Sequence, residues 1–296
     1  MINKIIVPLD GSQLAEVALP YAEENAGRLG ADMLLVTVRE PRDERSQYML
    51  ECYLEKMAEV AKTGASKYLA KGAKPITVTR KVLSGSSAEE IVSLAEHEEG
   101  SKIVMATHGQ SGFTRWALGS VADKVIRATI RPVTVIRAQG AKPAVHEKGY
   151  LNRILAPIDL SKESEVVLPY LEEFASALKA EVTFLHVLKR DTLTISTEAL
   201  ELAKKNRESA ERQLAKLAQR LNKKGIAAKS EVVETIGDIS DEINRYTKEH
   251  YTDSIVMATH GRSGPRRWVL GSVANKVLRE GNTPLTLIRT TGPFKD

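Results

Sequence analysis

Cysteine, aromatic residues and long apolar runs are all scarce in this sequence. The single cysteine, Cys52, excludes a disulfide within the chain and leaves any metal site to the 6 histidines and the carboxylates. No stretch approaches the roughly 18 apolar residues that a transmembrane helix needs. The opening segment, MINKIIVPLDGS, has no apolar run long enough for a signal peptide. We therefore expect a cytoplasmic protein with no membrane partner.

The sequence also lacks the usual catalytic motifs. It contains no GxxxxGK[ST] phosphate-binding loop and no GxGxxG after its first strand, which argues against the common NTPase and dinucleotide-binding classes. No GxSxG, HExxH or CxxC motif supplies a nucleophile or a metal site. Nothing specifies a catalytic centre, so we expect no enzyme, or at most weak ATP hydrolysis.

Charge does not single out a nucleic-acid partner. The formal net charge is +5, but lysine and arginine are interleaved with glutamate and aspartate in helix-like stretches such as KKNRESAERQLAKLAQR. We interpret these stretches as solvated helix faces. No motif combines basic and aromatic residues in the way that stacks bases, so we expect no nucleic acid as a partner.

The strongest positive feature is an internal repeat. The segment KIIVPLDGSQLAEVALPYAEE returns 149 residues later as RILAPIDLSKESEVVLPYLEE, and KIVMATHGQSGFTRWALGSVADKVIR returns 152 residues later as SIVMATHGRSGPRRWVLGSVANKVLR. The second copy is therefore three residues longer between these two segments, and such an insertion belongs in a loop or at a helix end. The 296 residues are therefore predicted to form two copies of one domain, with a linker at 138–150.

Each copy alternates short apolar segments with helix-like ones. The predicted strands are 5–9, 33–38, 76–83, 102–106 and 132–137, and then 154–158, 182–187, 228–234, 254–258 and 284–289. Helices are expected from the serine caps Ser12 and Ser161, in the middle of each copy, at 88–97 and 239–250, and from 119 and 271. This pattern predicts the α/β class: two tandem Rossmann-like domains, each a five-stranded parallel sheet with helices on both faces.

Several apolar residues are expected to pack rather than to bind. We interpret Trp116 and Trp268 as packing or interface residues. The long middle helices carry apolar stripes at helical spacing, which should face the sheet. The stripes comprise Leu50, Leu54, Met57, Ala61, Ala65 and Tyr68 in the first copy, and Leu202, Ala210, Leu214, Leu217 and Leu221 in the second.

Three features gather where the strands end, which is where open α/β sheets bind ligands. The first is the aspartate after the first strand, Asp10 or Asp159, in a Pro-x-Asp setting with Pro8 or Pro157. Its carboxylate can accept hydrogen bonds from a ribose or a base edge, and it can equally cap the helix that follows. The residues alone leave both interpretations open.

The second feature is a glycine-containing loop, at 107–118 and 259–270, and the third is the Gly-Ser pair that opens the next helix, at 119–120 and 271–272. Glycine lets a backbone approach phosphate oxygens, and a helix N-terminus offers N–H groups and a partial positive charge. For the loop histidines, His108 and His260, we favour a ligand contact over a structural role. Phosphate contact and solvated surface stay open for Arg115, Arg262, Arg266 and Arg267.

Together these motifs resemble the universal stress proteins in their tandem two-domain form. The nucleotide-binding members of that family have a glycine, two residues, a second glycine, nine residues, and then glycine with serine or threonine, a spacing that this sequence shares. Both copies have alanine at the first position, which adds a methyl group and disfavours left-handed backbone angles. The resemblance implies domains at 1–140 and 150–292 with the adenine nucleotide α hydrolase-like fold. The pattern falls on Ala106, Gly109, Gly119 and Ser120, and on Ala258, Gly261, Gly271 and Ser272.

The resemblance also implies a stress-response or regulatory protein that binds ATP, ADP or AMP, with Mg²⁺ left open. By the same resemblance, the two aspartates contact the adenosine, two valine backbones meet the adenine edge, and the glycines and serines hold phosphates. The expected nucleotide contacts are Pro8, Asp10, Val38, Ala106, His108, Gly109, Gly119, Ser120 and Val121 in the first copy, and Pro157, Asp159, Val187, Ala258, His260, Gly261, Gly271, Ser272 and Val273 in the second.

Further expectations concern the pair of copies. Gly11 aligns with Leu160 and Phe113 with Pro265, which implies unequal affinities. The resemblance implies pairing of the copies through their last strands, 133–136 beside 285–288, and leaves a homodimer open. One alternative is an interaction scaffold that has lost nucleotide binding, suggested by the two alanines. Another is an enzyme of nucleotide hydrolysis or nucleotidyl transfer, whose SGGxDS and HxGH patterns are absent.

Overall fold

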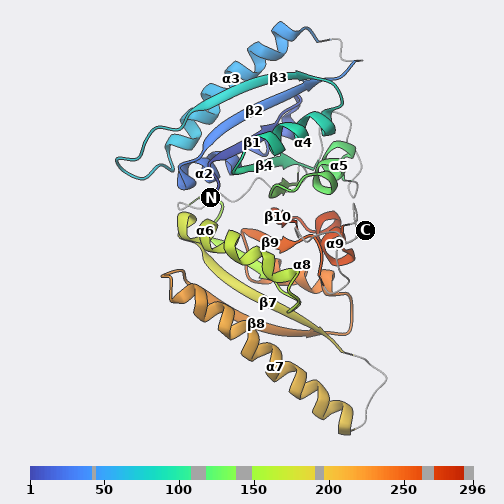
Figure 1. Ribbon diagram of the computed structural model, residues 1–296. Helices are drawn as coiled ribbons and strands as arrows, with labels where there is room; N and C mark the ends of the chain where they lie inside the picture. Colours follow the sequence, from blue (N-terminus) through green and yellow to red (C-terminus); the bar gives the residue numbers. More distant parts are fainter. Residues whose placement is uncertain (42–44, 108–117, 138–148, 191–196, 262–269, 290–296) are drawn as a thin grey trace. The chain divides into compact units, whose positions relative to one another are not determined.

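The chain divides into two compact units, Met1–Leu151 and Asn152–Asp296. The computed structural model (Figure 1) describes residues 1–41, 45–107, 118–137, 149–190, 197–261 and 270–289 of them. Both units repeat one succession of strands and helices.

The described part of the first unit contains five parallel strands in the order β3-β2-β1-β4-β5. The strands are Lys4–Pro8 (β1), Asp32–Arg39 (β2), Val78–Ser84 (β3), Ser101–Ala106 (β4) and Val133–Ile136 (β5). The helices are Gln13–Glu16 (α1), Leu19–Leu29 (α2), Gln47–Ser66 (α3), Ser87–His97 (α4) and Ser120–Ala128 (α5).

The described part of the second unit has the equivalent order, β8-β7-β6-β9-β10, again with parallel pairs. Its strands are Arg153–Pro157 (β6), Glu181–Lys189 (β7), Ala228–Thr235 (β8), Ser254–Ala258 (β9) and Leu285–Ile288 (β10). The helices are the 3₁₀ turn Ser164–Val167 (η1), Leu168–Leu178 (α6), Thr197–Asn222 (α7), Ile239–Glu249 (α8) and Ser272–Glu280 (α9). The predicted α/β class with two tandem parallel sheets is confirmed.

Strand order decides where a ligand can bind. Because β1 lies between β2 and β4, the chain winds outward to one edge through β3 and to the other through β5. Right-handed connections then put α2 and α3 on one face of the sheet and α4 and α5 on the other, and the helices contact each other within these pairs. The strand order reverses between β1 and β4, and likewise between β6 and β9, so the residues that follow these strands meet there.

Two local predictions are wrong. The helices expected from Ser12 and Ser161 are split, the first into α1 and α2 and the second into η1 and α6. In each case a proline in the first turn of the later helix, Pro20 or Pro169, has no N–H with which to continue a preceding helix. In α7, Leu202 is 59% exposed instead of facing the sheet. Among the side chains of this helix that the structure describes, the first buried one is Ala210, and in Figure 1 the N-terminal end of α7 projects away from β8.

The end of the predicted linker folds back onto α2. The Tyr150 amide donates to Oε2 of Glu24 at 2.6 Å, and the Tyr150 ring lies 5.2 Å from that of Tyr21. Glu24 is fully buried and pairs with Arg28 at 2.9 Å. Gly149, with φ +100°, passes so close to the Glu24 carboxylate that a Cβ would collide with it. The residues just before β6 are thus anchored to the first unit.

Candidate functional site

Asp10 and Asp159 leave their strands in the same tight turn. Oδ1 of Asp10 accepts hydrogen bonds from the amide and the hydroxyl of Ser12 at 3.0 and 2.6 Å. Oδ1 of Asp159 accepts the same pair from Ser161 at 3.0 and 2.5 Å. In the first unit the helix cap is therefore Ser12, whose Oγ accepts from the Ala15 amide at 3.2 Å. Each aspartate instead bonds to the serine two residues later through one carboxylate oxygen, and this bonding fixes the direction of the whole side chain.

A buried polar side chain on the second strand of each unit ties this turn to the sheet. Thr37 Oγ1 donates to the Leu9 carbonyl at 2.8 Å. In the second unit, His186 Nδ1 lies 2.6 Å from the Ile158 carbonyl, and because a carbonyl only accepts, Nδ1 is the donor. Neither residue was predicted from the sequence, although a polar residue inside an otherwise apolar strand was a usable signal.

The glycines allow close approaches between the parts of the site. The amides of Gly119 and Gly271 donate to the carbonyls of Thr107 and Thr259, both at 2.8 Å, so the same bond closes the base of each loop. A Cβ at Gly261 would collide with Oδ2 of Asp159, and one at Gly271 would lie 2.9 Å from the Thr259 oxygen. Glycine thus lets the aspartate turn, the loop and the next helix meet at one place.

Helices α5 and α9 open toward this place. Their N-caps are Gly119 and Gly271, and no side chain among the described residues caps either helix. The serine that follows each cap is exposed and the next residue, Val121 or Val273, is half-buried. First-turn amides that no side chain covers present donors and the positive end of the helix dipole, an arrangement that suits a phosphate.

In the second unit these parts line a single cavity of about 490 Å³. This size falls within the range of about 300–1,000 Å³ that is usual for small-molecule sites. All of the second-copy residues expected to contact nucleotide belong to its lining: Pro157, Asp159, Val187, Ala258, His260, Gly261, Gly271, Ser272 and Val273.

Other cavity residues were not predicted. Ile239 and Ile243, one turn apart on α8, form an apolar wall, and Met257 on β9 adds to it. Lys189 at the end of β7 and Asn206 on α7 bring polar groups to the rim. The spacing of the two isoleucines on an amphipathic helix was the signal that could have identified this wall.

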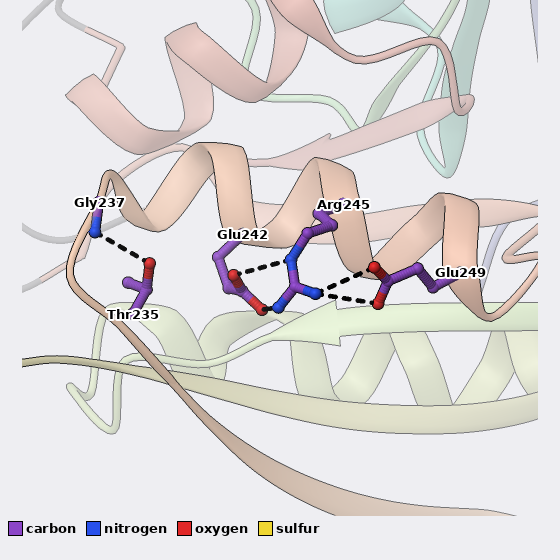
Figure 2. Close-up of polar contacts among 5 residues, drawn as sticks. All are labelled: Thr235, Gly237, Glu242, Arg245 and Glu249. Atoms are coloured by element: carbon purple, nitrogen blue, oxygen red, sulfur yellow. Dashed lines mark hydrogen bonds and ion pairs between the residues drawn. The ribbon is translucent and has the colours of Figure 1, made fainter.

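Ion pairs and hydrogen bonds also run along α8 itself. Figure 2 shows Arg245 between two glutamates, with Nε 3.2 Å from Oε2 of Glu242 and Nη1 2.9 Å from Oε1 of Glu249. In the turn that leads into the helix, the Gly237 amide donates to Thr235 Oγ1 at 3.1 Å. These bonds lie within the helix that carries the apolar wall and within the turn before it, so they favour its helical form.

The same helix is tied to α9. Asp238, the N-cap residue of α8, makes no capping bond with its side chain; Lys276 of α9 donates to it at 2.5 Å. Lys276 also pairs with Asp241 at 3.1 Å. The lysine holds the pKa of the Asp238 carboxyl below its ordinary value. The apolar wall and the helix that opens toward the cavity are thereby joined.

The alanines at the first motif position require no unusual backbone angles. Ala106 and Ala258 are the last residues of β4 and β9, where they pair with Ile136 and Ile288. Among the described residues with side chains, positive φ angles occur elsewhere, at Leu160, Lys179 and Tyr251. An extended strand residue does not need glycine, so these positions tolerate the substitution without backbone strain.

In the first unit the expected contacts occupy equivalent positions as far as they are described. They lie at the ends of β1, β2 and β4 and at the start of α5: Pro8, Asp10, Val38, Ala106, Gly119, Ser120 and Val121. In the second unit, His260 Nδ1 lies 3.0 Å from Thr259 Oγ1. The remaining loop residues named from the sequence lie outside the described residues: His108, Gly109, Phe113, Arg115, Trp116, Arg262, Pro265, Arg266, Arg267 and Trp268.

The described residues also bear on metals and membranes. Within the described ranges, no group of three or more histidine, cysteine, aspartate and glutamate side chains is arranged to hold a metal ion. None of the helices described is both long and apolar enough to cross a bilayer. Cys52 is exposed on α3.

Comparisons with known proteins agree with the repeat. A universal stress protein of Methanocaldococcus jannaschii is 27% identical over 154 residues, which cover 46% of this chain and 94% of that protein. One from Synechocystis is 22% identical over 312 residues, covering 97% of this chain and all of its own length. The solved structure of a universal stress protein from Archaeoglobus fulgidus has a TM-score of 0.67 at 19% identity, covers 97% of this chain and 96% of its own, and shows the same fold.

The family model gives the most direct result. The model described as the universal stress protein family matches residues 1–137 and, a second time, residues 151–289. The two matches cover one unit each and together span most of the chain. The chain therefore belongs to the universal stress protein family, in which it is a tandem two-domain member.

Proposed function

We propose that this protein binds adenine nucleotide, as ATP, ADP or AMP, and acts in the cytoplasm in a stress-response or regulatory role with little or no catalysis. The observation that supports this most is the second-unit cavity, whose lining contains the aspartate, the glycines and the helix start of the nucleotide-binding motif. The first unit has the same turn and helix start, so two sites per chain are the expected stoichiometry.

The cavity supplies suitable surroundings for an adenosine. The apolar side chains of Ile158, Ile239 and Ile243 offer contacts for the faces of the base. The last residue of β6 that pairs with β7 is Pro157, which lies beside Leu185. Val187 lies two residues further along β7, beyond the end of β6, so its backbone is available to the base edge. Asp159 is expected to accept hydrogen bonds from the ribose hydroxyls.

The phosphates are expected at the start of α9. The first-turn amides and the Ser272 hydroxyl provide donors, and the helix dipole favours negative charge there. Parallel titrations with and without Mg²⁺ will show whether the metal complex of ATP or the free nucleotide is bound.

Hydrolysis is expected to be slow. The ionisable side chains in the described cavity lining are Asp159, His186, Lys189 and His260. Asp159 and His186 are already bonded to Ser161 and to the Ile158 carbonyl, which leaves little freedom for a general base. We expect a turnover far below the roughly 1–10³ s⁻¹ that is typical of enzymes. A phosphate-release assay giving tens of turnovers per second would overturn this part of the proposal.

Calorimetric titration of the nucleotide-free chain with ATP tests the proposal. We expect two sites in the wild-type chain and one in each of the variants Asp10→Ala and Asp159→Ala. Ser161→Ala is the matched control for the second, because it removes a hydrogen bond from the aspartate turn and keeps the carboxylate. If Ser161→Ala abolished binding as fully as Asp159→Ala, the aspartate would act through the shape of the turn rather than on the nucleotide.

Absence of binding would favour the scaffold alternative. No heat at millimolar ATP, together with no rise in the unfolding temperature, would mean that neither unit binds the nucleotide. Association of two chains, which the family resemblance leaves open, can be measured on the same samples by analytical ultracentrifugation.

A further inference from the structure

Helices α5 and α9 begin alike but differ in charge within the first turns. The fourth residue is Asp123 in α5 and Asn275 in α9. Both residues donate their backbone amide to the glycine cap, at 2.9 and 2.8 Å. They therefore occupy the same place, about one helical turn from the amides that face the expected phosphates.

The two side chains also have the same geometry. Oδ2 and Oδ1 of Asp123 accept from Nε and Nη2 of Arg127 at 2.8 and 3.0 Å. Oδ1 of Asn275 accepts from Nε of Arg279 at 3.1 Å. Asparagine thus keeps the bond to the arginine one turn later and removes the negative charge. The pair Asn275–Arg279 therefore has a net charge of one positive unit more than the pair Asp123–Arg127.

This difference should matter more as the ligand charge rises. A carboxylate in the first turns of a helix favours the helix itself, since it faces the positive end of the dipole. The same carboxylate competes with a bound phosphate for the helix dipole and also repels that phosphate. Each additional phosphate charge on the ligand adds to the repulsion. Lys276, beside Asn275, is paired with Asp238 and Asp241, so its charge is largely compensated.

We infer that the two units select different adenine nucleotides: the second unit, with Asn275, prefers the triphosphate, and the first unit, with Asp123, discriminates against it in favour of less charged forms such as AMP and adenosine. The inference rests on the proposed nucleotide function. In the second unit it also rests on the cavity, whose lining includes Ser272 and Val273 at the start of α9.

Chains with a single working site separate the two units. Asp10→Ala leaves the second site and Asp159→Ala leaves the first, and each is titrated with ATP, AMP and adenosine. We expect the ratio of ATP affinity to adenosine affinity to be larger for the second site. Ratios that are equal, or larger for the first site, would overturn the inference and leave nucleotide binding intact, whereas no binding of any of the three compounds would mean that the proposed function itself fails.

Reciprocal substitutions then identify the cause. Asn275→Asp in the Asp10→Ala chain is expected to weaken ATP binding about two- to fivefold, and Asp123→Asn in the Asp159→Ala chain to strengthen it by a similar factor. Adenosine affinity should stay unchanged in both, because adenosine carries no phosphate. An equal change for adenosine, or no change for ATP, would contradict the inference. The difference should also shrink at high salt, which screens charge.

Discussion

At the residue scale, the turn after the first strand stores backbone strain in only one of the units. Gly11 has φ +84° and Leu160, its counterpart, has φ +66°. Left-handed angles cost a residue with a side chain about 1–2 kcal/mol. Leu160→Gly removes this cost, while the greater freedom of glycine in the unfolded chain offsets about 0.5–1 kcal/mol of the gain.

We therefore expect Leu160→Gly to raise the free energy of unfolding by up to about 1 kcal/mol, measured by urea denaturation. The reverse change, Gly11→Leu, should lower it by about 1–2 kcal/mol. A loss of stability in Leu160→Gly would show that contacts of the leucine side chain outweigh the strain of its backbone.

Glu23 and Glu172 occupy equivalent positions in the two units, but their neighbours shift the pKa of the carboxyl in opposite directions. Glu23 on α2 lies against Gly64 of α3, and burial raises its pKa to about 7, although Lys67 lowers it in part. Glu172 on α6 is bonded to Lys224 and Arg220, which hold its pKa below the ordinary value.

The two substitutions by glutamine should therefore act in opposite directions. Native Glu23 binds its proton more tightly than the unfolded chain does, so its contribution to stability is complete below pH 4.5 and is lost as the pH rises to about 7. Glu23→Gln is expected to raise the free energy of unfolding at pH 8 and to change it little at pH 4. The contribution of Glu172 is present at neutral pH and is lost in acid, so Glu172→Gln should destabilise the protein at pH 7. Urea denaturation at pH 4 and pH 8 measures the effect of Glu23→Gln, and denaturation at pH 7 measures that of Glu172→Gln. Destabilisation by Glu23→Gln at pH 8 would contradict the assignment.

At the scale of elements, α7 is built from two different halves. Leu200 and Leu202 near its start are 53% and 59% exposed, whereas Leu214 is fully buried against the sheet. Leu214→Ala is expected to lower the free energy of unfolding by about 2–5 kcal/mol. The matched control, Leu202→Ala, should change it by less than about 0.5 kcal/mol. Equal losses in thermal and urea unfolding would mean that the start of α7 is packed in solution.

The helices and strands that could be predicted are those whose sequence signals lie within the element itself. The strands and most helices were predicted because apolar runs, serine caps and Gly-Ser helix starts lie within the segments themselves. The break before α2 and the exposed start of α7 were not, because the first depends on one proline and the second on where the sheet ends in space. In the site, the repeat identified the aspartate and the glycines. His186 and Ile239 left signals in the sequence, a polar residue in an apolar strand and an amphipathic helix, but their place beside the cavity depends on which elements are neighbours in space.

At the scale of the whole molecule, the boundary between the units is fixed by a buried carboxylate. Glu24 accepts the Tyr150 amide and pairs with Arg28. A fragment of residues 1–151 keeps these contacts, and a fragment of residues 1–137, which spans the first family-model match, lacks Tyr150. Leaving a buried acceptor without its donor costs about 1–3 kcal/mol, so we expect the longer fragment to be more stable by about that amount.

Thermal unfolding of the two fragments measures the difference. Glu24→Gln in the longer fragment is the matched control and should remove much of the advantage, because the charge that strengthens both bonds is lost. Equal unfolding temperatures for the two unsubstituted fragments would mean that the first unit does not depend on residues 149–151.

The bond at the base of each loop has a consequence for protein engineering. The amide of Gly119 and the carbonyl of Thr107 fix both ends of one segment, and Gly271 with Thr259 fix both ends of another of equal length. Each segment is therefore an exchangeable cassette, whose replacement leaves the sheet and the following helix with the same attachment points. Grafting one unit's cassette into the other leaves Asp123 and Asn275 in place, so such a chimera separates the contribution of the loop from that of the helix charge, much as hypervariable loops are moved between antibody frameworks.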